Sequence, residues 1–182
     1  NNILSDNEVV FEFSGRENLS SLIRNYCEKN LEIFSCEEKR EISFEENYNS
    51  SAIICSRRTG AMGSLKINQE IESLLEERGL KESGNDFYHG RPIIITENDY
   101  RLGLFNGDTG YCLEDKATGN FFVKFAGLEN KVAEMQLPSH ESAFAITAHK
   151  SQGSEFNNVF FVLGLIDDVA DNPNLINREL VY

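Results

Sequence analysis

The sequence predicts an α/β fold with a small β-barrel inserted into it, and three features support this prediction. Residues 51–56 form a short apolar run that is best explained as a buried strand, and a loop follows at 57–60. Apolar residues then recur at helical spacing until Gly79, which is a suitable residue for ending a helix. Strand, loop and helix in this order form half of a βαβ unit, the unit from which parallel sheets are built.

The second feature is a change of pattern between residues 91 and 138. Short apolar segments at 92–96 and 121–125 alternate with turn signals, and no helical periodicity is visible. The dipeptide Asn106-Gly107 predicts a two-residue hairpin. We therefore expect a small β-barrel in this part of the chain, with at least two of Phe121, Phe122 and Phe125 in a core.

The third feature is the return of strand-like segments at residues 143–147 and 158–163, the latter apolar enough to be buried on both faces. The ends of the chain give weaker signals. Alternation at 9–13 suggests a further strand, and Asn172 followed by proline suggests the start of a final helix. Asn18 is a candidate N-cap for a helix that carries Leu19, Leu22, Ile23 and Tyr26.

Composition limits the classes of function. The formal net charge of −13 argues against strong, independent binding of this chain to nucleic acid, because phosphate contacts need Lys and Arg. No apolar run approaches the roughly 20 residues of a membrane span, and no signal-peptide pattern is visible, so we predict a protein without membrane contact. The four cysteines are scattered and lack metal-site spacing, so we expect free thiols in a reducing cytoplasm and no bound metal.

One polar loop carries the most specific signal. Residues 145–156 read AITAHKSQGSEF: a strand ends, and a hydroxyl, an imidazole, an ammonium, an amide and a carboxylate follow within a few positions. Loops at the carboxyl edge of open α/β sheets bind ligands, and Gly153 permits the close approach of another molecule. A plain linker between two strands is the alternative, but chance explains a contiguous pattern of this length poorly.

This loop closely resembles motif V of the superfamily-one DNA helicases, in the form found in RecD-type proteins such as the alpha subunit of exodeoxyribonuclease V. Residues 53–60 resemble motif IV, with Arg58 at the position of the family's ATP-facing arginine. Residues 90–110 are similar to the SH3-like insertion of RecD-type helicases. Residues 177–182 resemble the opening of motif VI, but the arginine finger lies beyond that match, and Arg178 is not its equivalent.

The resemblance implies a domain organisation. Residues 1–90 and 139–182 would belong to a RecA-like motor domain, termed 2A, and residues 91–138 to an inserted SH3-like domain, termed 2B. Walker A, Walker B and the motif VI arginine are not found in this sequence. We therefore expect a C-terminal motor-domain fragment of a longer helicase, which would use ATP and Mg²⁺ as a whole but would bind neither as a fragment and would be inactive alone.

The resemblance also implies residue roles on the nucleotide side. Arg58 would act in catalysis by contacting the γ-phosphate, where a well-placed arginine contributes on the order of 10³–10⁵ in rate. Gly153 and Glu155 would face the nucleotide, with Glu155 accepting a ribose hydroxyl. A solvated loop is the alternative explanation for Arg58 and its neighbour Arg57, and from local sequence alone it is at least as good.

On the DNA side, Thr147, His149 and Lys150 would contact the backbone of a single strand, and Gln152 would couple the two sites. A histidine bonded within its own loop and a solvated lysine are the alternatives for His149 and Lys150. The implied partners are single-stranded DNA, a separate N-terminal motor domain and, in exodeoxyribonuclease V, the beta and gamma subunits.

The family implies 5′ to 3′ travel and a role in double-strand break repair and recombination. Two alternatives stay open on the sequence. One is a stand-alone RecD-like or relaxase-type helicase domain, and the other is a non-catalytic SH3-like binding module on an α/β support.

Overall fold

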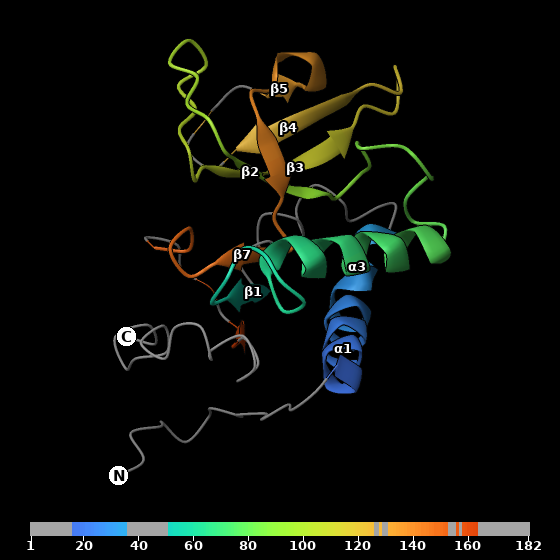
Figure 1. Cartoon of the computed structure of the whole chain (residues 1–182). Helices are drawn as coiled ribbons and strands as arrows, with labels where there is room; N and C mark the ends of the chain where they lie inside the picture. Colours follow the sequence, from blue (N-terminus) through green and yellow to red (C-terminus); the bar gives the residue numbers. More distant parts are fainter. Residues whose placement is uncertain are drawn as a thin grey trace.

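The structure is a computed structural model, and it describes residues 16–35, 51–125, 128, 131–152, 156 and 158–163 of the 182-residue chain. Figure 1 shows the arrangement of these elements. In chain order they are α1 (Arg16–Ser35), β1 (Ser51–Cys55), α3 (Ser64–Glu77), β2 (Pro92–Ile95), β3 (Thr109–Glu114), β4 (Phe121–Phe125), β5 (Val132–Ala133), the 3-10 helix η1 (Glu134–Gln136), β6 (His140–Ser142), β7 (Ala145–Thr147) and β8 (Asn158–Val162).

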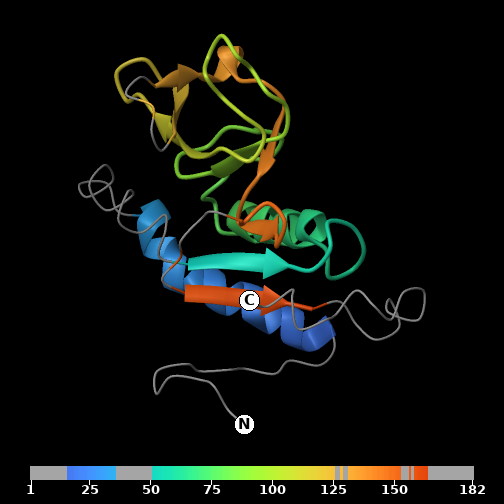
Figure 2. The ribbon, with the colours of Figure 1, turned by 90° about the vertical axis from the view of Figure 1, so that its left-hand side faces the viewer.

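A parallel sheet forms one part of the molecule, with the strand order β7-β1-β8. Strand β1 lies in the middle, and Ile53 is opposite Ala145 on one side and Phe160 on the other. Figure 2 shows β1 and β8 running side by side in the same direction. Strands without a polar face need cover on both sides, which explains the apolar run of β1. The predicted α/β class and the predicted parallel strands are confirmed.

Helices α1 and α3 supply the cover for this sheet. Leu22 and Ile23 of α1 join Ile67 and Ile71 of α3 in a single buried cluster with the strands. The ring of Tyr26 also meets the ring of Phe160 edge-on, with centroids 5.9 Å apart. The helical stripe predicted for α3 is therefore confirmed as its core face.

Helix α3 ends at a glycine in the left-handed backbone conformation. Gly79 has φ +69°, its N–H donates to Glu76 O at 3.0 Å, and the N–H of Leu80 donates to Leu75 O at 2.9 Å. This pair of bonds is the Schellman arrangement, in which a left-handed residue satisfies the last carbonyls of the helix. The prediction that α3 stops at Gly79 is confirmed.

The second part is an antiparallel sheet, which we call the β-module, with the order β5-β4-β3-β2-β6. It has a core of its own, formed by Ile93, Ile95, Leu104, Cys112, Val123, Phe125 and Val132. Figures 1 and 2 both place it beyond α3, on the side away from β8. Its strands β3 and β4 confirm the prediction of β-structure without helix between Tyr111 and Phe125. The β-module extends past residue 138, since β6 pairs with β2.

Two predictions about local structure are wrong, and two others concern residues outside the described part of the chain. Asn18 lies inside α1, which begins at Arg16, so Asn18 is not its N-cap. Asn106 and Gly107 form a turn just before β3 within the long connection from β2, so they do not make a two-residue hairpin. The strand expected at 9–13 and the helix expected after Asn172 lie outside the described residues.

The three phenylalanines of β4 differ in burial. Phe125 is buried in the core of the β-module, whereas Phe121 and Phe122 are both half buried, and Phe122 packs against Tyr111 and Leu113. Two of the three therefore pack as predicted. Within the part of the chain that the structure describes, no helix is both long enough and apolar enough to cross a membrane.

Candidate functional site

The candidate site lies at the carboxyl edge of the parallel sheet. Cys55, the last residue of β1, is opposite Thr147 of β7 and Val162 of β8. Two backbone hydrogen bonds continue the pairing past the strands: Ala148 N–H donates to Cys55 O at 3.0 Å, and Ser56 N–H donates to Val162 O at 3.0 Å. The loops that follow β1 and β7 therefore begin next to each other, at the edge where open α/β sheets bind ligands.

The first of these loops runs from Ser56 to Gly63 and leads directly into α3. Its carbonyls at Arg57 and Arg58 accept the N–H groups of Ser64 and Leu65, at 3.0 and 3.1 Å. The helix start is thereby satisfied by the loop itself, which holds the arginine backbone in place. Gly63 is required here, because a Cβ at this position would lie 2.5 Å from Thr59 O.

The side chain of Arg58 is half exposed, with a relative accessibility of 51%, and it forms an ion pair with Glu141 of β6. Arg57 is half buried. Of the two arginines, Arg58 therefore offers its guanidinium to solvent at the sheet edge. A guanidinium carries five N–H donors in a planar fork, a geometry that suits carboxylates and phosphates alike.

The second loop is a tight turn built on Thr147. The N–H groups of Lys150 and Ser151 donate to Thr147 O at 2.9 and 3.0 Å, and Ser151 Oγ donates to Ala148 O at 2.9 Å. His149 projects into solvent, whereas Lys150 and Thr147 are half buried. The backbone of the turn is thus satisfied internally, and the exposed imidazole is available to an external partner.

The structure brings together some of the predicted site residues. Arg58 lies on the β1–α3 loop, and Thr147, His149, Lys150 and Gln152 lie on the neighbouring loop after β7, with Gln152 exposed. Gly153 and Glu155 lie outside the described residues. Among the residues that are described, no group of three or more His, Cys, Asp or Glu side chains is placed to hold a metal ion.

Sequence reasoning missed a clamp between α3 and the strand segment that leads to the second loop. The side-chain amide of Asn68 donates to Ser142 O at 2.8 Å and to Ala145 O at 2.9 Å, and its Oδ1 accepts the N–H of Ala145 at 2.8 Å. Asn68 is 6% exposed. The available signal was a polar residue beside Ile67 on the buried face of a helix.

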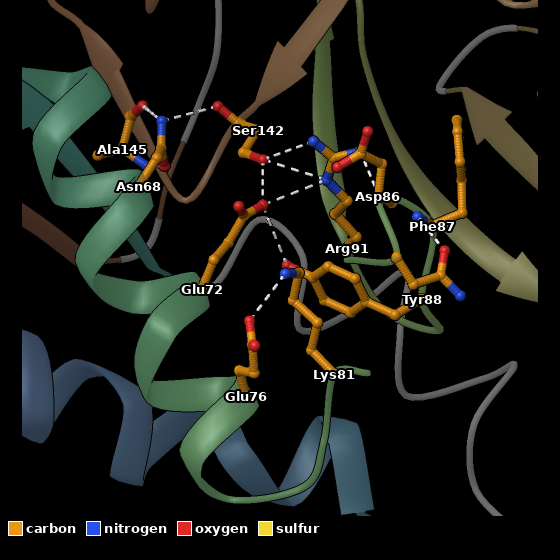
Figure 3. Close-up of polar contacts among 11 residues, drawn as sticks. Asn68, Glu72, Glu76, Lys81, Asp86, Phe87, Tyr88, Arg91, Ser142 and Ala145 are labelled. Atoms are coloured by element: carbon orange, nitrogen blue, oxygen red, sulfur yellow. Dashed lines mark hydrogen bonds and ion pairs between the residues drawn. The ribbon is translucent and has the colours of Figure 1, made fainter. Parts of the chain in front are cut away.

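A second polar group adjoins this clamp and joins α3 to the β-module (Figure 3). Glu72 accepts hydrogen bonds from Ser142 Oγ and from the Tyr88 hydroxyl, the latter at 3.4 Å, and pairs with Arg91 Nε at 3.4 Å. Arg91 also donates to Ser142 Oγ from Nε and Nη2, at 3.1 and 2.9 Å, and to Asp86 O at 2.5 Å. We call Glu72, Tyr88, Arg91 and Ser142 the junction.

The junction is largely shielded from water. The side chains of Arg91 and Glu72 are 10% and 23% exposed. Burial, and then the nearby Glu72 carboxylate, raises the pKa of Tyr88. Buried charges are stable only when they are paired and hydrogen-bonded, and here each member has partners within the group. The junction therefore fixes the β-module on α3, the helix that starts at the arginine loop.

The sequence of this chain is similar to those of several known proteins. The RecBCD enzyme subunit RecD of Haemophilus influenzae is 38% identical over 154 residues, which are 81% of this chain. The subunit of the same name from Mycobacterium tuberculosis strain H37Rv is 33% identical over 130 residues, 71% of this chain. This chain is RecD-like over most of its length. It spans 22% of each of these two relatives, so the likeness concerns one part of a RecD protein.

The RecD-like character extends to a second type of relative. The ATP-dependent RecD2 DNA helicase of Deinococcus radiodurans is 30% identical over 133 residues, which are 71% of this chain and 18% of that protein. No family model matches the chain. A solved structure of a Bacteroides Pif1 helicase with ADP-AlF3 and single-stranded DNA covers 80% of this chain at 17% identity, but its TM-score of 0.40 is too low to assign a fold.

Proposed function

We propose that this chain forms part of the second motor domain of an ATP-dependent DNA helicase of the RecD type. The observation that carries the proposal is the meeting of two loops at one sheet edge. The loop with Arg58 and the loop with His149 leave neighbouring parallel strands, and the bond from Ala148 N–H to Cys55 O joins their starts. A motor needs a nucleotide contact and a strand contact that share one rigid support.

On the nucleotide side, Arg58 is proposed to contact the γ-phosphate of ATP. Its guanidinium is half exposed, and its backbone is fixed by the start of α3, so the charge is both accessible and positioned. Gly153 and Glu155 are proposed to face the same nucleotide. ATP and Mg²⁺ would be held mainly by a phosphate loop elsewhere in the full-length protein, since this sequence has no Gly-Lys-Ser/Thr pattern.

On the DNA side, His149 is proposed to contact the sugar-phosphate backbone of a single strand, together with Thr147 and Lys150. The exposed imidazole at the tip of the turn fits this role. Gln152, in the same loop, is proposed to couple strand binding to hydrolysis. The overall charge of −13 is unfavourable for DNA, so this contact is proposed to work within a longer enzyme and not alone.

The RecD-like sequence also supports proposals about the location, cellular role and partners of the full-length protein. The full-length protein would act in the cytoplasm, travel 5′ to 3′ and serve double-strand break repair and recombination. In an exodeoxyribonuclease V its partners would be the beta and gamma subunits. The present chain would supply the RecA-like domain 2A together with the SH3-like domain 2B, expected at residues 91–138 and extended by β6 to Ser142.

The test uses the full-length protein and separates the two loops. Arg58→Ala is expected to lower ATP turnover sharply while single-strand affinity stays nearly intact. His149→Ala or Thr147→Ala is expected to lower strand affinity several-fold, since a net hydrogen bond contributes about 0.5–1.5 kcal/mol, and to spare hydrolysis without DNA. Gln152→Ala is expected to bind both ligands but to show weaker stimulation of hydrolysis by DNA.

Arg101→Ala is a matched control for Arg58→Ala, because Arg101 is an arginine of the β-module whose side chain is 89% exposed. It removes the same charge and is expected to leave ATP turnover unchanged. Weaker DNA binding as the main effect of Arg58→Ala, or loss of DNA-independent hydrolysis as the main effect of His149→Ala, would contradict the assignment of the two loops. Normal ATP turnover and strand affinity in all four variants would favour a non-catalytic binding module.

A further inference from the structure

The ion pair between Arg58 and Glu141 joins two parts of the molecule that are far apart in sequence. The residues are separated by 83 positions: Arg58 lies on the loop before α3, and Glu141 lies on β6 of the β-module. Their side chains are 51% and 27% exposed. The pair is thus open to an incoming anion, and neither charge is locked in the interior.

Each partner is held by a different body. The backbone of Arg58 is fixed to the parallel-sheet body, because its carbonyl accepts the N–H of Leu65 at 3.1 Å. Glu141 is fixed to the β-module, because β6 pairs with β2 and places Glu141 opposite Ile94. Its neighbour Ser142 belongs to the junction, with Arg91 donating to Ser142 Oγ at 2.9 Å. Because Ser142 also bonds to Glu72 and Asn68 of α3, the junction holds Glu141 within reach of Arg58.

The same guanidinium cannot fully serve two anions. Carboxylate and phosphate both take the fork of an arginine in the same bidentate geometry, so Glu141 and a nucleotide phosphate would compete for Arg58. An exposed ion pair favours its paired state over its open state by a factor of only about 1 to 5. A phosphate can therefore displace the carboxylate.

We propose that Glu141 is a built-in counter-ion that holds Arg58 and must release it before Arg58 engages a nucleotide phosphate. The inference rests on the proposed contact of Arg58 with nucleotide. Release would remove one contact between the parallel-sheet body and the β-module. Nucleotide binding would therefore change the contacts of β6, and through β6 those of the strand β7 that follows it. Glu141 is a positioning residue in this scheme and touches no substrate.

The experiment measures binding of a non-hydrolysable ATP analogue to the full-length protein without DNA. Glu141→Gln is expected to tighten binding about twofold to fivefold, because the competing charge is gone. The same substitution in an Arg58→Ala background is expected to change nothing. Glu114→Gln is the matched control: it removes an exposed carboxylate at the opposite end of the β-module, where Glu114 pairs with Phe121, and is expected to leave binding unchanged.

The outcomes separate the two ideas. Unchanged or weaker binding by Glu141→Gln overturns the counter-ion role, and so does an equal gain in the Arg58→Ala background. If Arg58→Ala alone leaves both nucleotide affinity and ATP turnover unchanged, the proposed function of Arg58 fails instead. Should Glu141→Gln not fold, Glu141→Asp keeps the charge but shortens its reach; a gain in affinity then supports the proposal, and no gain overturns it.

Discussion

Asn68 on α3 and Ala145 on β7 exchange hydrogen bonds in both directions. The amide of Asn68 donates to Ala145 O at 2.9 Å, and the N–H of Ala145 donates to Asn68 Oδ1 at 2.8 Å. A side chain thus pairs with the outer edge of a sheet strand in the manner of a neighbouring strand. The contact lies two residues before Thr147, so it sets the place from which the proposed DNA loop begins.

Asn68→Ala is expected to destabilise the protein by about 3 kcal/mol. The substitution removes three hydrogen bonds and leaves buried backbone groups of β7 without partners, each at a cost of about 1–3 kcal/mol. Urea unfolding followed by circular dichroism measures the change. Gln69→Ala, at an exposed position on the same helix, is the control and should remain within about 0.5 kcal/mol. Equal stability of the two variants would show that Asn68 is not a clamp.

Arg91→Met is expected to cost about 3 kcal/mol, because it keeps the apolar stem but leaves Glu72 in the junction without its cationic partner. Thermal unfolding is a suitable measurement, and the loss should appear as a lower Tm. The control is Arg101→Met, since Arg101 is 89% exposed and its loss should change the free energy of unfolding little. A Tm for Arg91→Met equal to that of the control would refute a stabilising junction.

Gly63→Ala is expected to destabilise the arginine loop by about 1–3 kcal/mol, as overpacking commonly does. The added Cβ would lie 2.6 Å from Arg58 O, so the backbone would have to move. Besides lower stability in urea, the full-length variant should lose ATP turnover, because Arg58 would be displaced. Ser73→Ala, at an exposed position of α3, should do neither. Wild-type stability and turnover for Gly63→Ala would count against a rigid loop.

The thiols of Cys27, Cys55 and Cys112 should be unreactive in the folded protein at pH 8. Burial raises the pKa of Cys27 to about 11 and that of Cys55 and Cys112 to about 12, and a thiol reacts as its thiolate. A background of Cys36→Ser removes the one cysteine that lies outside the described residues. Labelling by a thiol-specific reagent should then occur only in denaturant, and rapid labelling without denaturant would contradict the buried positions.

The same shifts predict a pH dependence of stability. The folded-state pKa of Cys55 lies above the ordinary value of 9.0, so the unfolded chain loses its proton first as the pH rises. Its contribution is fully present below pH 9 and is lost progressively toward pH 12. Cys55→Ala should flatten the alkaline loss of stability in a urea titration at pH 8 to 11. An unchanged slope would exclude Cys55 as its source.

The chain on its own should not hydrolyse ATP. Its sequence has no phosphate-loop pattern, and the proposed contribution is one arginine that acts on a nucleotide held elsewhere. A coupled assay of ATP turnover with and without single-stranded DNA measures this directly. DNA-stimulated turnover comparable to that of an intact helicase would overturn the proposal that this chain supplies only one side of the site.

The sequence determined the local elements through patterns that depend on neighbours along the chain. Apolar residues at helical spacing and a glycine at the end define α3, and the apolar run of residues 51–55 defines β1. The contiguous motif at 145–156 indicated the second loop. Turn type was harder: Asn106-Gly107 was wrongly predicted as a hairpin, because a long connection with its own bridge between Asp99 and Leu104 precedes β3.

Only the tertiary structure decided which polar residues meet. Asn68, Glu72, Arg91 and Ser142 are separated by up to 74 positions, and nothing in their local sequence pairs them. The same holds for Arg58 and Glu141, which share a contact because β6 returns from the β-module beside the arginine loop. Periodicity arises from one segment facing one core and is visible along the chain, whereas a long-range ion pair or hydrogen bond exists only after strand order and register have brought its partners together.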